Sequence, residues 1–170
     1  MNVSAQSETT GVSPDLPPLR IGLLVLFAGL SVAILAVGGW LTSLGFGEWY
    51  DALEKPWFQP PGWAFGPAWF SIFTLLAIAT WQIARRGAVA RTALWIYGAQ
   101  LVLNLLWSLL FFTLHRPGWA LVEIVVLDVV LFVMVFLYGR IHRAAGWMLV
   151  PYAGWLLFAT AINVAVVVLN

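Results

Sequence analysis

The sequence predicts an all-α membrane protein, built as a single bundle of five transmembrane helices. Hydrophobic residues make up 62% of the 170-residue chain and charged residues only 9%, and the mean hydropathy is +0.94. These values lie far outside the range of water-soluble domains. The apolar residues also form five separate runs, each of the roughly 20 residues that a helix needs to cross a hydrocarbon core of about 30 Å.

The predicted spans follow one another from residue 21 to the end of the sequence. They are Ile21–Thr42, Ala64–Ala84, Ala93–Leu114, Gly118–Tyr138 and Gly146–Leu169. Residues 1–20 are polar and contain acids and prolines, so we expect a disordered tail followed by one transmembrane domain, residues 21–170. A cleaved signal peptide is the alternative interpretation of the first run, although the acidic leader and the length of the run favour a span.

One connection, residues 43–62, is longer than the others. A loop of about 20 residues in a compact bundle is more often a lid or a binding loop than a spacer. Pro60 and Pro61 stiffen this loop, and Pro67 is tolerated in the first turn of the next helix. We therefore expect a rigid lid over one end of the bundle.

Basic residues are distributed unequally between the two sides of the membrane. The side of the N-terminus collects Arg20, Arg85, Arg86, Arg91, Arg140 and Arg143, and the other side has only Lys55 and Arg116. Because Lys and Arg concentrate in cytoplasmic loops, this bias predicts a cytoplasmic N-terminus and an outward-facing long loop.

Several classes of chemistry are disfavoured by composition. Eight basic and seven acidic residues give a net charge of +1 without a basic block, so we expect no nucleic-acid partner. The chain has no Cys, and His115 and His142 fall on opposite sides of the membrane. We therefore expect neither a metal site nor a resident cofactor.

Eleven Trp residues are a large excess for this length. Five lie near span ends and fit the aromatic belt that anchors helices at membrane interfaces, namely Trp40, Trp49, Trp95, Trp119 and Trp147. The belt does not explain Trp69 and Trp107, about 8 to 9 Å below the outer surface, or Trp155 at a depth of about 20 Å.

Polar and aromatic residues share single faces of two spans. These stripes are Gln100, Asn104, Trp107 and Phe111 on the third span and Tyr152, Trp155, Ala159 and Asn163 on the fifth. Amides in hydrocarbon need partners, so the stripes predict either interhelical hydrogen bonds or ligand contacts, and both remain open. With Trp69 and Phe73 they would enclose an aromatic-walled pocket suited to a flat apolar ligand.

Two acids, Glu123 and Asp128, fall inside the fourth span. Glu123 lies near the outer surface, whereas an unpaired carboxylate at the depth of Asp128 costs at least about 2.5 kcal/mol. We therefore expect Asp128 to be protonated or paired, and a functional role is the default hypothesis. On these residues alone, a proton-coupled transporter remains an alternative.

Three segments resemble one known family. Residues 49–69 are WYDALEKPWFQPPGWAFGPAW, residues 100–107 are QLVLNLLW and residues 151–163 are PYAGWLLFATAIN. They resemble, in this order, the WYxxLxKPxWxPPxWxFxPxW, QLxLNxxW and PYxxWxxFAxxLN signatures of the TspO/translocator protein family, also called tryptophan-rich sensory proteins or peripheral benzodiazepine receptors. The resemblance covers residues 21–170.

The resemblance implies a five-helix protein, usually a homodimer, that binds porphyrins such as protoporphyrin IX beneath its first loop. It implies a pocket lined by Trp69, Asn104, Trp107, Trp155, Phe158 and Ala159, under a lid that contains Trp49, Tyr50, Pro60 and Pro61. Phe73 and Tyr152 join these candidates because they belong to the aromatic faces described above. The expected partners are a porphyrin or another flat apolar molecule, the lipid bilayer and a second copy of the chain.

The favoured function is a membrane receptor or sensor for tetrapyrroles, involved in their handling or in stress signalling. A porphyrin or small-molecule transporter is one alternative, and a light-dependent porphyrin-degrading enzyme that uses Trp69 and Trp155 is another. The sequence departs from the family pattern at Phe58, Phe73 and Asp128. The basic residue needed for the sterol motif of animal relatives is missing after Asn163.

Overall fold

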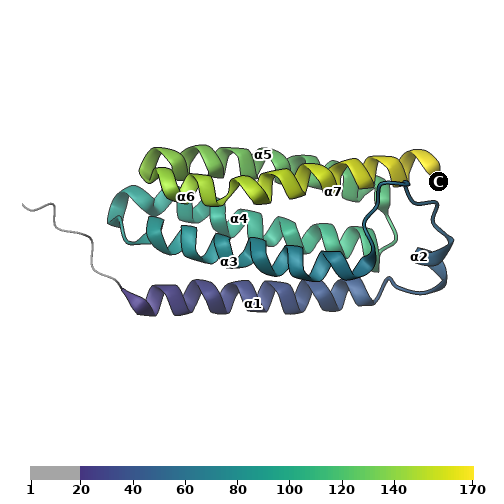
Figure 1. Cartoon of the computed structure of the whole chain (residues 1–170), viewed down its shortest axis with the longest axis horizontal. Coiled ribbons are helices and arrows are strands. Elements are labelled where there is room, and N and C mark those ends of the chain that lie inside the picture. The colour runs from purple at the N-terminus through teal and green to yellow at the C-terminus, as the bar shows by residue number, and fades with distance from the viewer. Residues whose placement is uncertain (1–19) are drawn as a thin grey trace, which may run out of the picture.

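The computed structural model describes residues 20–170, so the predicted tail lies outside the described residues apart from Arg20. Within this part, five helical segments are long and apolar enough to cross a membrane, which confirms the predicted fold class. The elements, shown in Figure 1, are α1 (Ile21–Ser43), α2 (Glu48–Ala52), η1 (Gly62–Ala64), α3 (Phe65–Ala84), η2 (Gly87–Ala90), α4 (Arg91–Ser108), η3 (Leu109–Thr113), α5 (Pro117–Ile141), α6 (Arg143–Met148) and α7 (Val150–Leu169).

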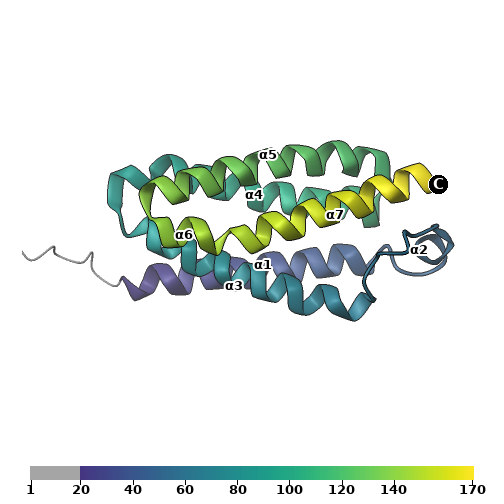
Figure 2. The same ribbon diagram turned by 45° about the horizontal axis from the view of Figure 1, so that its top comes forward.

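The spans form one elongated bundle along a common axis (Figure 1). All are helical because lipid offers the backbone no hydrogen-bond partners. α5 packs against α4, α6 and α7, and α1 packs chiefly against α3 and α4. Figure 2 shows α1 and α3 on one side of the bundle and α5 on the other. Only Phe27 and Ser31 of α1 are buried, so α1 is the most peripheral span.

The fifth predicted span is two helices rather than one. α6 ends at Met148 and α7 begins at Val150, with Pro151 in the first turn of α7. Proline has no N–H and its ring clashes with the preceding turn, so the helix is interrupted there. The interrupted segment, Arg143–Leu169, is still long enough to cross the membrane.

The third span ends in a π-helical turn, η3, which hydropathy did not predict. Thr113 Oγ1 donates to the carbonyl of Leu41 at 3.1 Å and ties this turn to α1. Gly45 lies so close to it that a Cβ on Gly45 would overlap the Phe112 backbone. The wide turn therefore needs a glycine opposite it.

The long loop crosses one end of the bundle, which we call the loop end, and contains the short helix α2 (Figure 1). The backbone N–H of Glu54 donates to Asn170 Oδ1 at 3.0 Å, and Asn170 Nδ2 donates to the Glu54 carbonyl at 3.1 Å. These two bonds attach the loop to the end of α7.

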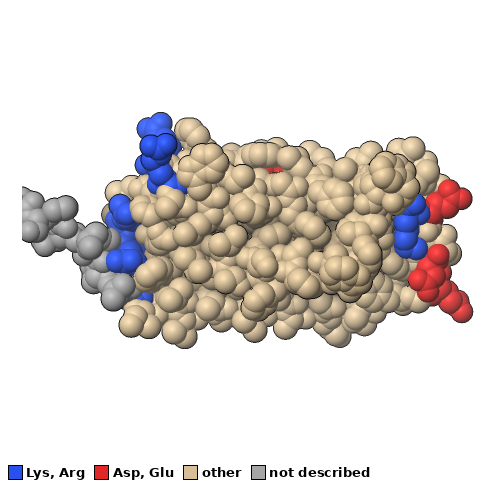
Figure 3. Space-filling model, in the orientation of Figure 1, with Lys and Arg blue, Asp and Glu red and all other residues tan. Residues whose placement is uncertain are grey.

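Charged residues separate by end of the bundle, as the sequence predicts. On the face shown in Figure 3, the end opposite the loop carries Lys and Arg only, whereas the loop end carries both acidic and basic groups. At the first end, the α3–α4 connection contains Arg85 and Arg86, Arg140 and Arg143 lie on either side of the α5–α6 junction, and neither place has an acid. The charge bias is therefore a property of the folded bundle, and the cytoplasmic N-terminus stays a prediction.

Candidate functional site

A cavity of about 530 Å³ lies under the loop, between α1, α3, α4 and α7. Its walls come from distant parts of the sequence. Because neighbouring spans are antiparallel, α1 and α4 end next to the loop, where α3 begins. The lining residues are Ile34, Leu35, Gly38, Gly39, Thr42, Phe46, Tyr50, Lys55, Gln59, Gly62, Phe65, Gly66, Trp69, Asn104, Trp107, Ser108, Phe112, Trp155 and Ala159.

Aromatic rings form one wall of this cavity. Trp69 and Trp155 meet edge to face with ring centroids 6.4 Å apart, and Phe65 lies 5.6 Å from Trp155 in the same way. Trp107 packs edge to face on Phe112 at 5.8 Å. Edge-to-face packing fixes the rings relative to one another, so the wall is preorganised before any ligand arrives.

Trp155 lies closer to the loop end than its sequence position suggested. Its ring contacts Phe65, the first residue of α3, instead of lying deep below Trp69. The reason is visible in Figure 1, where α7 projects beyond the start of α3. Depth counted along one helix is therefore a poor guide when neighbouring helices end at different levels.

A chain of neutral polar groups lies behind the wall. Asn104 Nδ2 donates to the Tyr152 hydroxyl at 2.8 Å, and this hydroxyl donates to Gln100 Oε1 at 2.9 Å. Gln100 and Tyr152 are fully buried, whereas Asn104 lines the cavity. The chain cross-links α4 to α7 and holds the Asn104 amide at the cavity surface.

A second cross-link lies nearer the loop end. Trp107 Nε1 donates to Asn163 Oδ1 at 3.1 Å, and Asn163 Nδ2 donates to the carbonyl of Pro117 at 2.9 Å. Asn163 thus joins α4, α5 and α7 and fixes the orientation of the Trp107 ring. Of the two alternatives left open by the polar stripes, these residues realise interhelical hydrogen bonding.

The loop supplies the polar cover of the cavity. Gln59 Nε2 donates to the Tyr50 hydroxyl at 3.1 Å. Burial raises the pKa of this hydroxyl, the bond from Gln59 lowers it and the charge of Asp51 raises it. Lys55 Nζ lies 4.5 Å from the centroid of the Tyr50 ring and lines the cavity as its cation.

Six of the twelve predicted site residues line the cavity, namely Tyr50, Trp69, Asn104, Trp107, Trp155 and Ala159. The other six lie around it. Phe73 and Tyr152 are buried behind Trp69, at 5.9 and 6.1 Å from its ring. Phe158 packs on Trp155 and Phe58. Pro60 and Pro61 belong to the loop next to the lining residues Gln59 and Gly62.

Trp49 does not line the cavity. Its ring stacks on His115 at 4.1 Å, with an angle of 14° between the planes. The other four predicted belt residues, Trp40, Trp95, Trp119 and Trp147, are exposed as expected. Trp49 instead connects α2 to the turn before α5.

The wall contributed by α1 had no signal in the sequence. Ile34, Leu35, Gly38, Gly39 and Thr42 line the cavity. Because α1 is apolar all round, no face of it stands out by periodicity. Lining residues such as Phe112 also depend on the π-helical turn, which no motif announced.

The two intramembrane acids lie apart from the cavity. Thr160 Oγ1 donates to Asp128 Oδ2 at 2.8 Å, which supplies the partner expected for Asp128. Glu123 is 7% exposed, and neither carboxyl oxygen has a hydrogen-bond partner among residues 20–170. In the same residues, no group of three or more potential metal ligands comes together.

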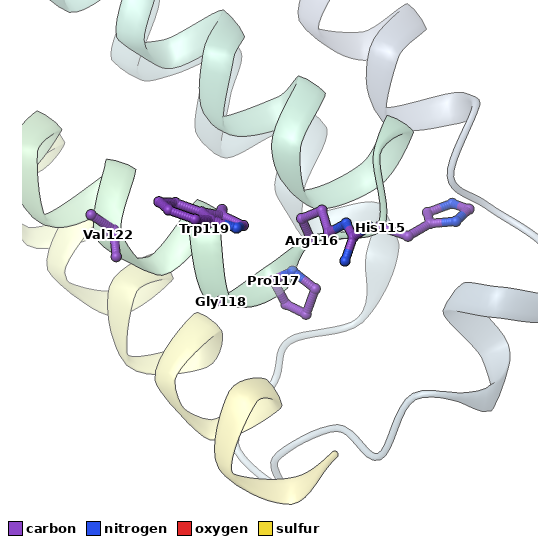
Figure 4. A pocket seen from close by; sticks show the side chains of 6 residues that line it. All are labelled: His115, Arg116, Pro117, Gly118, Trp119 and Val122. Carbon is purple, nitrogen blue, oxygen red and sulfur yellow. The ribbon is translucent and has the colours of Figure 1, made fainter.

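A separate hollow of about 430 Å³ lies at the start of α5 (Figure 4). Trp119 and Val122 lie along α5, and His115 points away from them. His115 has a positive φ of 52°. Because the labelled side chains do not converge, this hollow lacks the arrangement of a binding site, and the cavity under the loop is the stronger candidate.

Fold and site together define a class: a five-span helical membrane protein with an aromatic cavity of small-molecule size covered by a loop. Comparison with known proteins gives the particular family. The model described as the TspO/MBR family matches residues 25–169. The chain belongs to the TspO/MBR family, as the three motifs predicted.

Curated relatives from different domains of life cover most of the chain. The chain is 39% identical to the tryptophan-rich protein TspO of Archaeoglobus fulgidus over 162 residues, which cover 88% of this chain and 99% of the relative. It is 36% identical to the tryptophan-rich sensory protein of Cereibacter sphaeroides, covering 72% and 77%. It is 34% identical to the translocator protein of Sus scrofa, covering 77% and 82%.

Proposed function

We propose that this protein is a membrane receptor or sensor that binds porphyrins, or similar flat tetrapyrroles, in the aromatic cavity. One observation carries the proposal: Trp69, Trp107 and Trp155 line a single cavity of about 530 Å³. This volume lies within the range of small-molecule pockets, which combine mostly apolar walls with a few polar groups. The name of the Cereibacter sphaeroides relative, a tryptophan-rich sensory protein, supports a sensory role.

The polar groups of the cavity suit an amphiphilic ring system. Aromatic walls favour stacked or edge contacts with a flat conjugated ligand. Asn104 presents an amide on the α4 wall, and Lys55 lies at the loop side of the same space. An ammonium pairs well with a carboxylate when both are partly removed from water. A porphyrin that bears carboxylates would therefore place its ring between the Trp residues and its acid groups toward Lys55.

Titration of the purified protein in nanodiscs with protoporphyrin IX tests the proposal. We expect saturable quenching of Trp fluorescence together with a shift of the porphyrin absorption band. Trp69→Phe and Trp155→Phe should each raise Kd by roughly threefold to tenfold, because an aromatic contact contributes about 0.5 to 1.5 kcal/mol beyond its area.

Trp147→Phe is the matched control, since Trp147 is exposed and does not line the cavity. Its Kd should equal that of the unsubstituted protein. Quenching that rises linearly with porphyrin and never saturates would rule out the proposed site, as would equal effects of all three substitutions.

A further inference from the structure

A groove of about 580 Å³ lies beside the cavity at the loop end, between the loop and the last turns of α7. It is lined by Glu54, Lys55, Pro56, Trp57, Phe58, Ala165, Val168 and Leu169. Apart from Lys55, none of these residues lines the cavity. The groove is mostly apolar, and Trp57 in its rim is 95% exposed. The loop side of the groove belongs to the first family signature, and its other side, Ala165, Val168 and Leu169, lies beyond the signature of the fifth span.

Lys55 connects the groove to the cavity. A small hollow of about 40 Å³, lined by Tyr50, Lys55 and residues of the loop, α3, α4, η3 and α7, adjoins the cavity and shares Lys55 with the groove. Among the described residues, Lys55 alone lines all three spaces. Its Nζ donates to the carbonyls of Leu53 at 3.2 Å and Asp51 at 3.5 Å. An ammonium has three donors, so one N–H remains for an anion.

The loop is fastened at the same place. The two hydrogen bonds between the Glu54 backbone and the Asn170 side chain join the loop to α7 beside the groove. These bonds involve no cavity residue. Breaking them would free the segment that separates the groove from the cavity, while the aromatic walls on α3, α4 and α7 stay in place.

We propose that the groove is an entry vestibule, in which the anionic group of the ligand contacts Lys55 before its ring passes beneath the loop into the cavity. The inference rests on the proposed function, because it takes a carboxylate-bearing porphyrin as the ligand. The Glu54–Asn170 contact is the latch of this route. Passage through the vestibule controls the rates of binding and release, and the cavity controls the affinity.

A variant that fills the groove tests the route. Val168 is exposed and lines only the groove, so Val168→Trp narrows the vestibule without touching the cavity. In stopped-flow mixing with protoporphyrin IX, we expect association and dissociation to slow by a similar factor, about tenfold, with Kd unchanged. Ala165→Phe is a second variant with the same expectation. Val129→Trp, at an exposed position on α5 that does not line the groove, should change neither rate.

A variant that opens the latch should act in the opposite direction. Asn170→Ala removes both bonds to Glu54, so association and dissociation should both accelerate, by about threefold, again at constant Kd. Unchanged rates in both groove-filling variants would overturn the vestibule, and so would a change confined to one rate. If the unsubstituted protein shows no saturable binding, the proposed function itself fails, and this is seen before the variants are compared.

Discussion

Individual polar residues in the spans are held by specific partners. Asn163 bonds to Trp107 and to the Pro117 carbonyl, and Thr160 bonds to Asp128. Each bond satisfies a group that would be costly to leave unpaired in hydrocarbon. The helical spacing of Trp107 and Asn163 on their spans predicted that both point inward, and the hydrogen bond between them confirms it. Which residue pairs with which followed only from the packing of neighbouring helices.

His142 gives a prediction about pH. Its Nδ1 accepts the backbone N–H of Ala145 at 3.3 Å and so caps α6. Only the neutral ring can accept this bond. Burial lowers the pKa of His142 below its ordinary value of 6.5, and the charges of Arg86 and Arg85 lower it further. At pH values between the lowered pKa of the folded protein and the ordinary pKa of the unfolded chain, His142 is protonated more in the unfolded chain. The free energy of unfolding therefore falls as the pH falls through this window.

His142→Asn should remove this part of the pH dependence, because Asn caps a helix without titrating. Thermal unfolding of the detergent-solubilised protein measured across pH 5 to 8 checks it. The midpoint of the unsubstituted protein should drop more on acidification below the ordinary His pKa than that of the variant. Parallel curves for the two proteins would contradict the assignment.

At the scale of elements, helix contacts depend on glycines that have no motif. A Cβ added to Gly146 would lie 2.7 Å from the Gly139 Cα, so α6 and α5 touch through bare backbone. A Cβ added to Gly139 would meet no atom within 4 Å. Small residues of this kind let membrane helices approach closely. The two glycines therefore share a contact but tolerate substitution differently.

Gly146→Ala and Gly139→Ala should have opposite effects on stability. The first forces α6 away from α5 and should lower the free energy of unfolding by about 1 to 3 kcal/mol. The second gains helix propensity in open space and should raise it by about 0.5 to 1 kcal/mol. Unfolding in detergent mixtures measures both, and a shift in the same direction for the two variants would refute the close contact.

At the scale of the whole molecule, the charge bias predicts orientation. The chain has no Cys, so single cysteines can be labelled without background. Ala52 on α2 and Ala88 on η2 are exposed at opposite ends of the bundle. With a cytoplasmic N-terminus, a membrane-impermeant maleimide added to intact cells should label Ala52→Cys. It should spare Ala88→Cys until the membrane is permeabilised, and the reverse pattern would invert the orientation.

Homodimerisation remains a prediction from the family resemblance. α1 is the most peripheral span, and Gly29 and Ala33 lie on its exposed surface. Small exposed residues permit close helix contact.

The sequence alone determined the number of spans, their approximate bounds, the segregation of charge and the family. These features depend on local composition and on motifs, which a single pass along the chain detects. It also identified the three Trp residues of the cavity: Trp107 and Trp155 share helix faces with polar residues, and Trp69 lies too deep for the aromatic belt.

The tertiary structure decided which of these residues share a surface. It placed Phe73 and Tyr152 behind the wall, added α1 to the lining and brought Trp155 level with Phe65. It also joined Glu54 to Asn170, which are 116 positions apart in the sequence. The physical reason is that cavities and latches form where helix ends of different lengths meet. Those relative positions depend on packing between distant segments and not on the periodicity of any one of them.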